Sequence, residues 1–275
     1  MSSAEEASWQ DGRRPAVLIT GSHRSGSTWM GKLLGASAEL LYVHEPFNPE
    51  YHPSWMADSP TLWYQLPVPG GSLEQSLDGI MRLHYPVATN MLKIRHARHG
   101  GRVVRDALNG ALGRRRELRP LIKDPFLVFA AHDLNARYDC QVIFTVRNPA
   151  AFTSSLLRLD WRFDFGQLAQ QDVLMDRLEP WSSEIRQAAS SPLGPVDEAC
   201  LLWRIIHGSI ANALPELGPS AQVVIHEEFV TQVPYRLEKL SGWLNIAYSN
   251  EMRDTALALS EGSRQDHSMQ LGVNE

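Results

Sequence analysis

A short glycine-containing loop stands between an apolar run and a predicted helix near the start of the sequence. Residues 15–20 (PAVLIT) are apolar and partly β-branched, which predicts a buried β-strand. Residues 21–28 (GSHRSGST) are mostly small and polar, and Ser27 or Thr28 can cap a helix that runs to about Ser37. Backbone N–H groups of such a loop, together with the helix N-terminus, bind anions. We therefore predict an anion site in a strand–loop–helix unit.

Further apolar runs alternate with helical patterns along the chain. Strands are predicted at 40–45, 118–123, 141–146 and 221–226. Helices are predicted at 73–84, 101–112, 126–136, 149–159, 170–190, 196–214 and 234–245. This alternation predicts βαβ units, and so an α/β fold whose parallel sheet is flanked by helices on both faces.

The organisation of the chain is predicted from the same pattern. We expect a disordered leader over residues 1–14 and a single domain over residues 15–250. Residues 48–119 read as a long insert within that domain, and residues 251–275 as a C-terminal tail.

The composition excludes several other classes of protein. The 275 residues carry a formal net charge of −5, which argues against general binding to nucleic acid or acidic membranes. The two cysteines, Cys140 and Cys200, provide no disulfide framework and no zinc-ligand spacing. No run of eighteen apolar residues predicts a membrane span, and the N-terminus lacks the apolar core of a signal peptide. We therefore expect a cytoplasmic protein.

The glycine loop can be compared with the Walker A pattern GxxxxGK[ST] of P-loop kinases and NTPases. Gly21, Gly26 and Thr28 match the pattern, but Ser27 stands where the pattern has its lysine. The cation of the loop is Arg24, which lies before the second glycine. This departure counts against a kinase or NTPase. That class stays an alternative hypothesis, as does a non-catalytic nucleotide-binding protein.

The segment from Arg24 to Trp29 (RSGSTW) resembles the 5′-phosphosulfate loop of the sulfotransferase family. Members of that family use 3′-phosphoadenosine 5′-phosphosulfate (PAPS), and the resemblance implies a P-loop-NTPase-like three-layer α/β sandwich. It also implies that PAPS is bound by Arg24, Ser25, Gly26, Ser27, Thr28 and Trp29. Arg24 replaces the usual lysine of the family, and arginine keeps the charge but cannot give up a proton. Trp29 is expected either near the adenine or in the core.

A second motif follows the strand predicted at 141–146. Arg147 ends this strand, and Ser155 lies eight residues further on, in the next predicted helix. In sulfotransferases an arginine and a serine at this spacing hold the 3′-phosphate of PAPS, and Ser154 is the adjacent alternative. A guanidinium fork and a hydroxyl donor suit a phosphate group. The resemblance covers residues 15–245.

Three side chains are candidates for the base that accepts the proton of the acceptor. His44 and Glu45 end the second strand, and alternation along a strand places them on opposite faces. Carbohydrate-type sulfotransferases have a glutamate after their second strand, which in several members is the base. We therefore favour Glu45 over His44 and keep Asp124 in reserve. Pro125 stands where hormone-type members have their catalytic histidine.

Together these features predict an enzyme that transfers a sulfonyl group from PAPS to an acceptor hydroxyl. The predicted catalytic residues are Glu45, Arg24 and Lys123, of which Lys123 either holds the sulfonyl oxygens or pairs with Asp124 or Glu45. No metal is expected, because the sequence has neither a Walker lysine nor an obvious set of metal ligands. No nucleic-acid partner is expected either.

The acceptor is predicted only as a class: a carbohydrate, a lipid or a small natural product. Its pocket is expected to be lined or covered by the insert, whose aromatic residues are Tyr51, Trp55, Trp63, Tyr64 and Tyr85. The arginine-rich stretch 93–119 either binds an acidic acceptor, assists the anionic cofactor, or is a solvated helix face. The sequence does not predict the oligomeric state.

Overall fold

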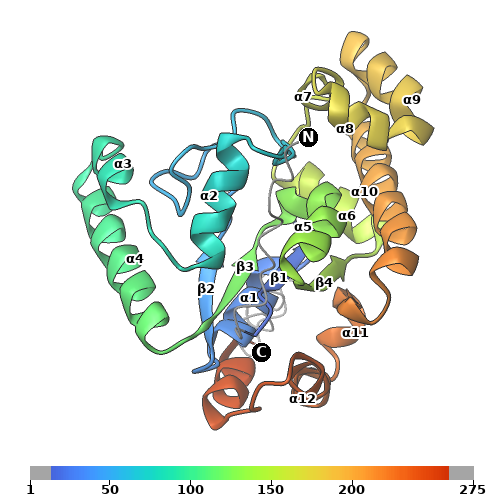
Figure 1. Cartoon of the computed structure of the whole chain (residues 1–275). Helices are drawn as coiled ribbons and strands as arrows, with labels where there is room; N and C mark the ends of the chain where they lie inside the picture. Colours follow the sequence, from blue (N-terminus) through green and yellow to red (C-terminus); the bar gives the residue numbers. More distant parts are fainter. Residues whose placement is uncertain (1–13, 260–275) are drawn as a thin grey trace, which may run out of the picture.

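Five short strands form one parallel sheet in the computed structural model, which describes residues 14–259 (Figure 1). The strands are β1 (Val17–Gly21), β2 (Leu40–His44), β3 (Arg119–Lys123), β4 (Gln141–Val146) and β5 (Ala221–Ile225). Their order across the sheet is β2-β3-β1-β4-β5, and every neighbouring pair is parallel. The predicted α/β fold with a parallel sheet is confirmed.

Helices fill the connections between the strands. Those before β4 are α1 (Ser27–Gly35), α2 (Ser72–Met81), α3 (Val87–Leu92), α4 (Ala97–Arg115), the 3₁₀ helix η1 (Pro125–Ala130) and α5 (Ala131–Tyr138). Those after β4 are α6 (Pro149–Arg158), α7 (Gly166–Ala169), α8 (Asp172–Arg177), α9 (Glu179–Ser190), α10 (Pro195–Leu217), the 3₁₀ helix η2 (Gly218–Ser220), α11 (His226–Phe229) and α12 (Val233–Leu244).

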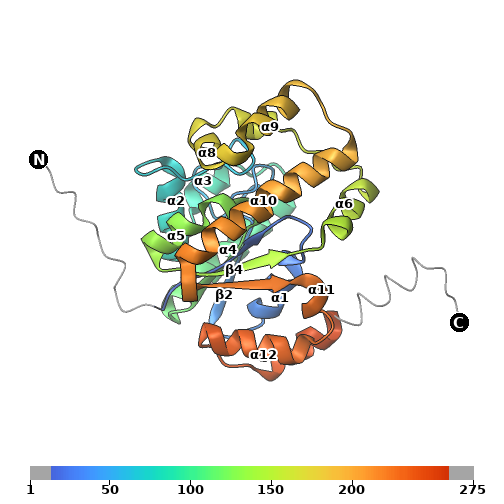
Figure 2. The same cartoon turned by 90° about the vertical axis from the view of Figure 1, so that its right-hand side faces the viewer.

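The sheet is buried on both faces, which gives three layers. Along β1, Val17 and Ile19 belong to one apolar cluster and Leu18 to the other, because side chains alternate along a strand. Helices α1, α11 and α12 cover the first face, and α5, α6 and α10 cover the second (Figure 2). A strand buried on both faces reads as a continuous apolar run, as 15–20 does.

The direction of chain progression across the sheet changes at β1. The chain runs from β1 through β2 to β3 on one side and then crosses to β4 and β5 on the other. Ligands of open parallel sheets bind at such a switch point, beyond the carboxyl ends of the strands. The loop at 21–26 lies at this point, between the ends of β3 and β4.

Two helix predictions differ from the structure. Residues 170–190 form two helices, α8 and α9, which follow the short turn after α7, instead of one long helix. The break falls at Leu178, two residues before Pro180, which lacks the N–H that a continuous helix would need. The predicted helix 126–136 is the 3₁₀ helix η1 followed by α5, which ends at Tyr138.

The ends of the chain lie partly outside the described residues. The predicted leader falls there except for Arg14, as do residues 260–275 of the predicted tail. Residues 250–259 are helical, and Met252 and Ala256 pack into the same apolar cluster as α12.

Gly21, the last residue of β1, is a site where a side chain is excluded. Its φ of 133° lies in a region that favours glycine, and a Cβ there would be 2.3 Å from the backbone oxygen of Thr145. We expect Gly21→Ala to lower the free energy of unfolding by about 3 kcal/mol, measured by urea denaturation. Gly101→Ala is the matched control. Nothing lies within 4 Å of a Cβ at this helical position, and stability should rise slightly. Equal stability of the Gly21 variant and the parent would contradict the clash.

Candidate active site

The loop after β1 has the conformation of an anion-binding turn. Gly21, Arg24 and Gly26 have positive φ angles of 133°, 61° and 87°. Gly26 precedes α1, and no side chain of the described residues caps this helix end. The N–H groups of the first turn are therefore available to an anion, which the helix dipole also favours.

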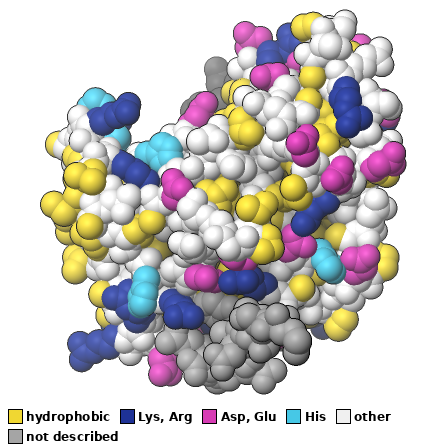
Figure 3. Space-filling model, turned by 45° about the horizontal axis from the view of Figure 1, so that its top comes forward, with side chains coloured by type: hydrophobic (Ala, Val, Ile, Leu, Met, Phe, Trp, Pro, Cys, Tyr) yellow, Lys and Arg dark blue, Asp and Glu magenta, His cyan; other side chains and the backbone are white. Residues whose placement is uncertain are grey.

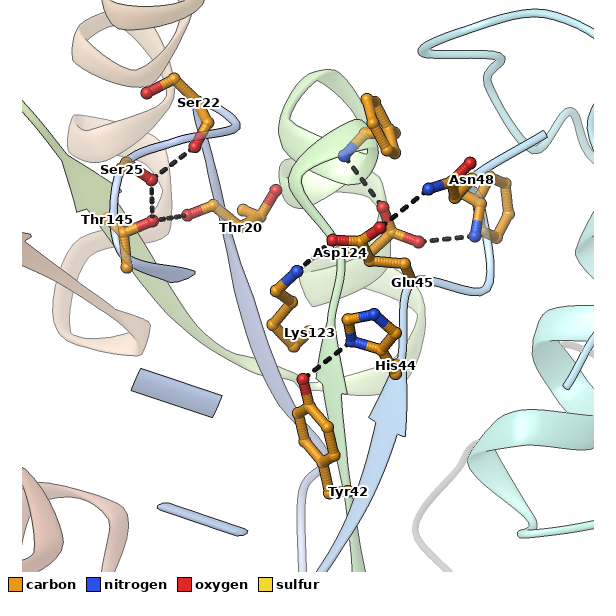
Figure 4. A network of polar contacts seen from close by, with 12 residues as sticks. Thr20, Ser22, Ser25, Tyr42, His44, Glu45, Asn48, Lys123, Asp124 and Thr145 are labelled. Carbon is orange, nitrogen blue, oxygen red and sulfur yellow. Dashed lines mark hydrogen bonds and ion pairs between the residues drawn. The ribbon is translucent and has the colours of Figure 1, made fainter. Parts of the chain in front are cut away.

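Hydroxyl groups fasten this loop to the neighbouring strand β4 (Figure 4). The Ser25 hydroxyl donates to the carbonyl oxygen of Ser22 and lies 2.6 Å from the Thr145 hydroxyl. Thr145 in turn donates to the carbonyl oxygen of Thr20 at 3.1 Å. Ser25 is buried, and its hydroxyl is used within the loop. What Ser25 offers to an anion is therefore its backbone N–H.

The structure brings the two sequence motifs together. The Nε of Arg24 donates to the hydroxyl of Ser155 at 3.1 Å, and Nη1 of Arg147 donates to the carbonyl oxygen of Arg24 at 2.7 Å. Both contacts follow from the sheet, in which Gly21 is paired with Thr145, two residues before Arg147. The glycine loop and the Arg147–Ser155 motif therefore lie side by side, although they are more than 100 residues apart in the sequence.

Arg147 has a donor that nothing else in the described chain satisfies. Its Nε is buried without a hydrogen-bond partner, and the nearest carboxylate oxygen, on Glu227, is 4.0 Å away. Burial lowers the pKa of the guanidinium, which nevertheless stays charged, and Glu227 opposes this effect. Unpaired buried donors are uncommon in proteins and often mark a place where a ligand binds.

Trp29 lies beside the loop and against α11. Its ring meets the ring of Phe229 edge-on with centroids 5.6 Å apart, and His226 lies at 6.2 Å. The indole N–H is buried without a partner in the described chain. Trp29 therefore packs at the margin of the core, with one polar atom unsatisfied.

Glu45 and Lys123 form an ion pair at the ends of β2 and β3 (Figure 4). Lys123 is buried, and Nδ2 of Asn48 donates to the other Glu45 oxygen at 2.8 Å. Burial alone would raise the pKa of Glu45, but Lys123 and Asn48 outweigh it and hold the pKa below its usual value. Glu45 is therefore ionised at neutral pH. The ion pair is one of the two roles predicted for Lys123.

The other two candidate bases have different partners (Figure 4). The Tyr42 hydroxyl lies 2.9 Å from Nδ1 of His44, whose ring packs edge-on against Tyr51. Asp124 is fully buried and accepts hydrogen bonds from the backbone N–H groups of Phe47 at 2.5 Å and Phe126 at 2.9 Å. Its carboxylate ties the exits of β2 and β3 together. Burial raises the pKa of Asp124 to about 7.

A cavity of about 270 Å³ joins the loop to the ion pair. It is lined by His23, Arg24, Ser27, Thr28, Glu45, Asn48, Glu50, Trp63, Lys123, Pro125, Phe126 and Trp161. Neither His44 nor Asp124 lines it. Glu45 is therefore the one candidate base of the three that lines the same cavity as the glycine loop.

A second cavity of about 180 Å³ shares part of this wall. His23, Glu50, Trp63, Phe126 and Trp161 line both, and the second adds Tyr64, Arg162, Phe163, Asp164 and Gln167. Of the aromatic residues of the insert, Trp63 and Tyr64 line these cavities, whereas Tyr51, Trp55 and Tyr85 line neither. Sequence reasoning missed the wall from 161 to 167, because no motif marks it.

His23 is a further residue that sequence reasoning missed. Its Nδ1 lies 3.1 Å from the Tyr64 hydroxyl, and its ring packs against Trp161 and Phe152. Burial, with a smaller contribution from Arg24, lowers the pKa of His23 to about 3. The ring is therefore neutral in the folded protein. Only its position inside the glycine loop could have drawn attention to it.

The low pKa of His23 predicts acid sensitivity of the fold. Histidine in the unfolded chain has a pKa of about 6.5, so falling pH protonates the unfolded state first. The contribution of neutral His23 to the free energy of unfolding is thus complete above pH 6.5 and is lost as the pH falls from 6.5 to about 3. We expect the stability difference between the parent and His23→Asn to narrow by about 2 kcal/mol from about pH 7.5 to 5, measured by urea unfolding.

The comparison between variants isolates His23 from other titrating groups. Asp124 has a raised pKa, so its effect on stability has the opposite sign, but it is present in both proteins. A stability difference that does not change with pH would show that His23 is not held neutral by burial.

The described residues contain neither a cluster of metal ligands nor a membrane-spanning helix. Across residues 14–259, no three His, Cys, Asp or Glu side chains are grouped so that they could hold a metal ion. No helix in this range is both long and apolar enough to cross a bilayer.

Comparison with known proteins gives the class of this molecule. The family model described as "Sulfotransferase family" matches residues 15–197, which hold both motifs and the Glu45–Lys123 pair. No curated protein matches the sequence. The fold and the motifs thus define a sulfotransferase-like α/β enzyme. The chain belongs to the sulfotransferase family, because the match spans well over half of it.

Solved structures with similar folds are also sulfotransferases. The sulfotransferase domain from the curacin biosynthetic pathway is 16% identical, with a TM-score of 0.49 over 87% of this chain and 77% of that one. The sulfotransferase domain from the olefin synthase of Synechococcus PCC 7002 is 16% identical, with a TM-score of 0.48 over 88% of this chain and 78% of that one. The sulfotransferase from Alicyclobacillus acidocaldarius is 15% identical, with a TM-score of 0.44 over 95% of this chain and 97% of that one.

Proposed function

We propose that this enzyme transfers a sulfonyl group from PAPS to an acceptor hydroxyl. The observation that carries the proposal is that the two anion-binding motifs touch each other. Arg24 bonds Ser155, and Arg147 bonds the backbone of Arg24. The same loop shares one cavity with a carboxylate–ammonium pair, in which Lys123 is buried and Glu45 is partly exposed. A group-transfer enzyme needs this combination of anion binding and a base.

The residues present fit the two phosphate positions of PAPS. The loop N–H groups, Arg24 and the hydroxyls of Ser27 and Thr28 suit the phosphosulfate end. Arg147 and Ser155 suit the 3′-phosphate, and the unpartnered Nε of Arg147 supports a ligand there. The unpartnered indole N–H of Trp29 supports a polar neighbour beside the loop, such as the nucleoside.

In the proposed mechanism Glu45 removes the proton of the acceptor hydroxyl. PAPS, when bound, supplies the sulfonyl group and a phosphate leaving group. As the acceptor oxygen bonds to sulfur, its proton passes to Glu45 and the bond from sulfur to the phosphate oxygen breaks. Protonation of Glu45 removes the charge that Lys123 now neutralises. Lys123 and Arg24 are then the cations that offset negative charge on the sulfonyl and phosphate oxygens.

The cavities indicate what kind of acceptor fits. Trp63, Phe126 and Trp161 line both cavities, and Tyr64 and Phe163 extend the wall away from the loop. Flat apolar rings of this kind pack against a sugar face or an aromatic ring. We therefore propose a small acceptor that presents a hydroxyl to Glu45 and an apolar face to these side chains. A sugar, a lipid head or a small natural product meets this description.

Calorimetric binding of adenosine 3′,5′-bisphosphate in EDTA tests the proposal. AMP and ATP with Mg²⁺ are the comparison ligands. We expect tight binding of the bisphosphate, much weaker binding of AMP, and no advantage for ATP with Mg²⁺. Preference for ATP with Mg²⁺ would favour a P-loop kinase or NTPase. Bisphosphate binding without turnover of PAPS by any acceptor would favour a non-catalytic nucleotide-binding protein.

A further inference from the structure

The segment from 87 to 116, here called the α3–α4 arm, forms one lateral edge of the molecule (Figure 1). Helix α4 approaches the rest of the protein closely because glycines occupy its inner face. A Cβ on Gly110 would be 2.8 Å from the backbone oxygen of Leu83, and one on Gly113 would be 2.8 Å from the Leu83 side chain. Val103 and Asp106 are buried on the same side of α4. The inner face is thus fully used in packing, and the outer face is the surface left over.

That outer face is apolar where a surface helix is usually polar. Val104, Leu108 and Leu112 follow one another at intervals of four, which places them in one stripe along α4. Large apolar side chains of the arm are exposed by 59% at Met91, 89% at Leu92, 60% at Val104, 65% at Leu108 and 43% at Leu112. Figure 3 shows hydrophobic side chains gathered on this side of the molecule. An exposed apolar surface of this kind marks an interaction site.

The arm is also strongly basic within an acidic protein. It contains eight Lys and Arg residues and one acidic residue, Asp106, a net charge of +7. Because the whole chain carries −5, the remainder carries −12. Arg95, Arg98, Arg115 and Arg116 make no side-chain hydrogen bond or ion pair with the described part of the chain. Arg119, at the end of the predicted basic stretch, is different. Its guanidinium is buried and bonds to Pro15, Gln141 and Leu244.

We infer that the α3–α4 arm binds the surface of an anionic lipid bilayer. Exposed Leu, Met and Val on a basic helix are the features of helices that lie in the bilayer interface, with apolar groups among the acyl chains and arginines at the phosphates. The charge distribution favours this partner. The net charge of +7 on the arm is attracted to an anionic surface, and the net charge of −12 on the remainder is repelled by it. A second copy docked arm to arm would place +7 against +7. The attachment is peripheral, and it does not depend on the proposed reaction.

Vesicle co-sedimentation of the full chain tests the inference. The probes are vesicles of phosphatidylcholine alone and of phosphatidylcholine with about 30 mol % phosphatidylglycerol. We expect binding to the anionic vesicles, little binding to the neutral ones, and weaker binding at about 0.5 M than at about 0.1 M NaCl. Equal binding to both kinds of vesicle, or to neither, would overturn the inference.

Paired substitutions locate the contact on the arm. Leu92→Ser with Leu108→Ser should lower the partition coefficient about tenfold or more, and Arg98→Gln with Arg115→Gln about tenfold or more. Val173→Ser with Val196→Ser, at residues exposed by 52% and 51% on α8 and α10, is the matched control and should leave binding unchanged. Thermal unfolding checks that each variant is folded. Unaltered vesicle binding by folded arm variants would overturn the inference. The inference would also be overturned if the parent did not bind vesicles but formed a dimer, measured by light scattering, that the leucine variants abolish.

Discussion

Glu45→Gln is expected to lower kcat by roughly 100- to 10,000-fold while leaving the affinity for adenosine 3′,5′-bisphosphate nearly unchanged. Glutamine preserves the shape of the side chain and can still accept a hydrogen bond from Lys123. It cannot take up a proton, so the step assigned to Glu45 is lost. Kinetics under saturating PAPS and calorimetry of the bisphosphate, on the same preparation, measure the two quantities separately.

The control for Glu45→Gln removes a carboxylate from an ion pair elsewhere. Glu184 pairs with Arg204 at 2.7 Å on the outside of α9 and α10, and Glu184→Gln should change kcat by less than about twofold. Because the pKa of Glu45 is held below its usual value, activity of the parent should fall only when pH drops below that ordinary range, near 4.5. A glutamine variant with parental kcat would reject Glu45 as the base.

Arg147→Ala is expected to weaken binding of adenosine 3′,5′-bisphosphate about 100-fold or more. The change removes charge-assisted hydrogen bonds to the 3′-phosphate, each worth about 1.5–3 kcal/mol. AMP, which lacks that phosphate, should lose much less affinity. Arg147→Lys keeps the positive charge but loses the forked guanidinium, so its affinity for the bisphosphate should lie between those of the parent and Arg147→Ala. Isothermal calorimetry with both nucleotides gives the ratio that decides the role.

Arg147 also supports the loop through the carbonyl of Arg24, and the design separates this effect. A purely structural role predicts that AMP and the bisphosphate lose affinity equally. Arg186→Ala is the control, because Arg186 is an exposed arginine on α9 that lines neither cavity. It should leave the affinity for both nucleotides nearly unchanged. Equal losses for the two nucleotides with Arg147→Ala would reject the 3′-phosphate assignment.

The strands and the meeting of the motifs could be predicted because their causes are local. Short runs rich in apolar residues predict strands, and each of the five runs predicted in this way is a strand of the sheet. Parallel strands place their carboxyl ends at one edge, so loops that follow strands in sequence come together in space. The positions of Arg24, Glu45, Lys123 and Arg147 next to strand ends follow from this rule, whereas the choice of Ser155 and the roles of all five residues came from the resemblance to sulfotransferases.

The rest of the site depends on packing that no local pattern records. Trp161 and Phe163 reach the second cavity only because the chain after α6 folds back over the insert. The contact of His23 with Tyr64 joins residues 41 positions apart through the interior. Residues 170–190 have helical character throughout, and one proline decides that the helix breaks. Such features follow from the tertiary structure and not from spacing.

The carboxyl group of Asp124, which links the ends of β2 and β3, also contributes to the electrostatic environment of the proposed base, Glu45. Asp124 does not line the cavity, and burial raises its pKa to about 7. Its negative charge and that of Glu45 repel each other, and this effect is reciprocal. The negative charge of an ionised Asp124 therefore favours uptake of a proton by Glu45, although Asp124 does not contact the acceptor. A buried side chain that links two strand ends thus also influences the protonation of the proposed base beside it.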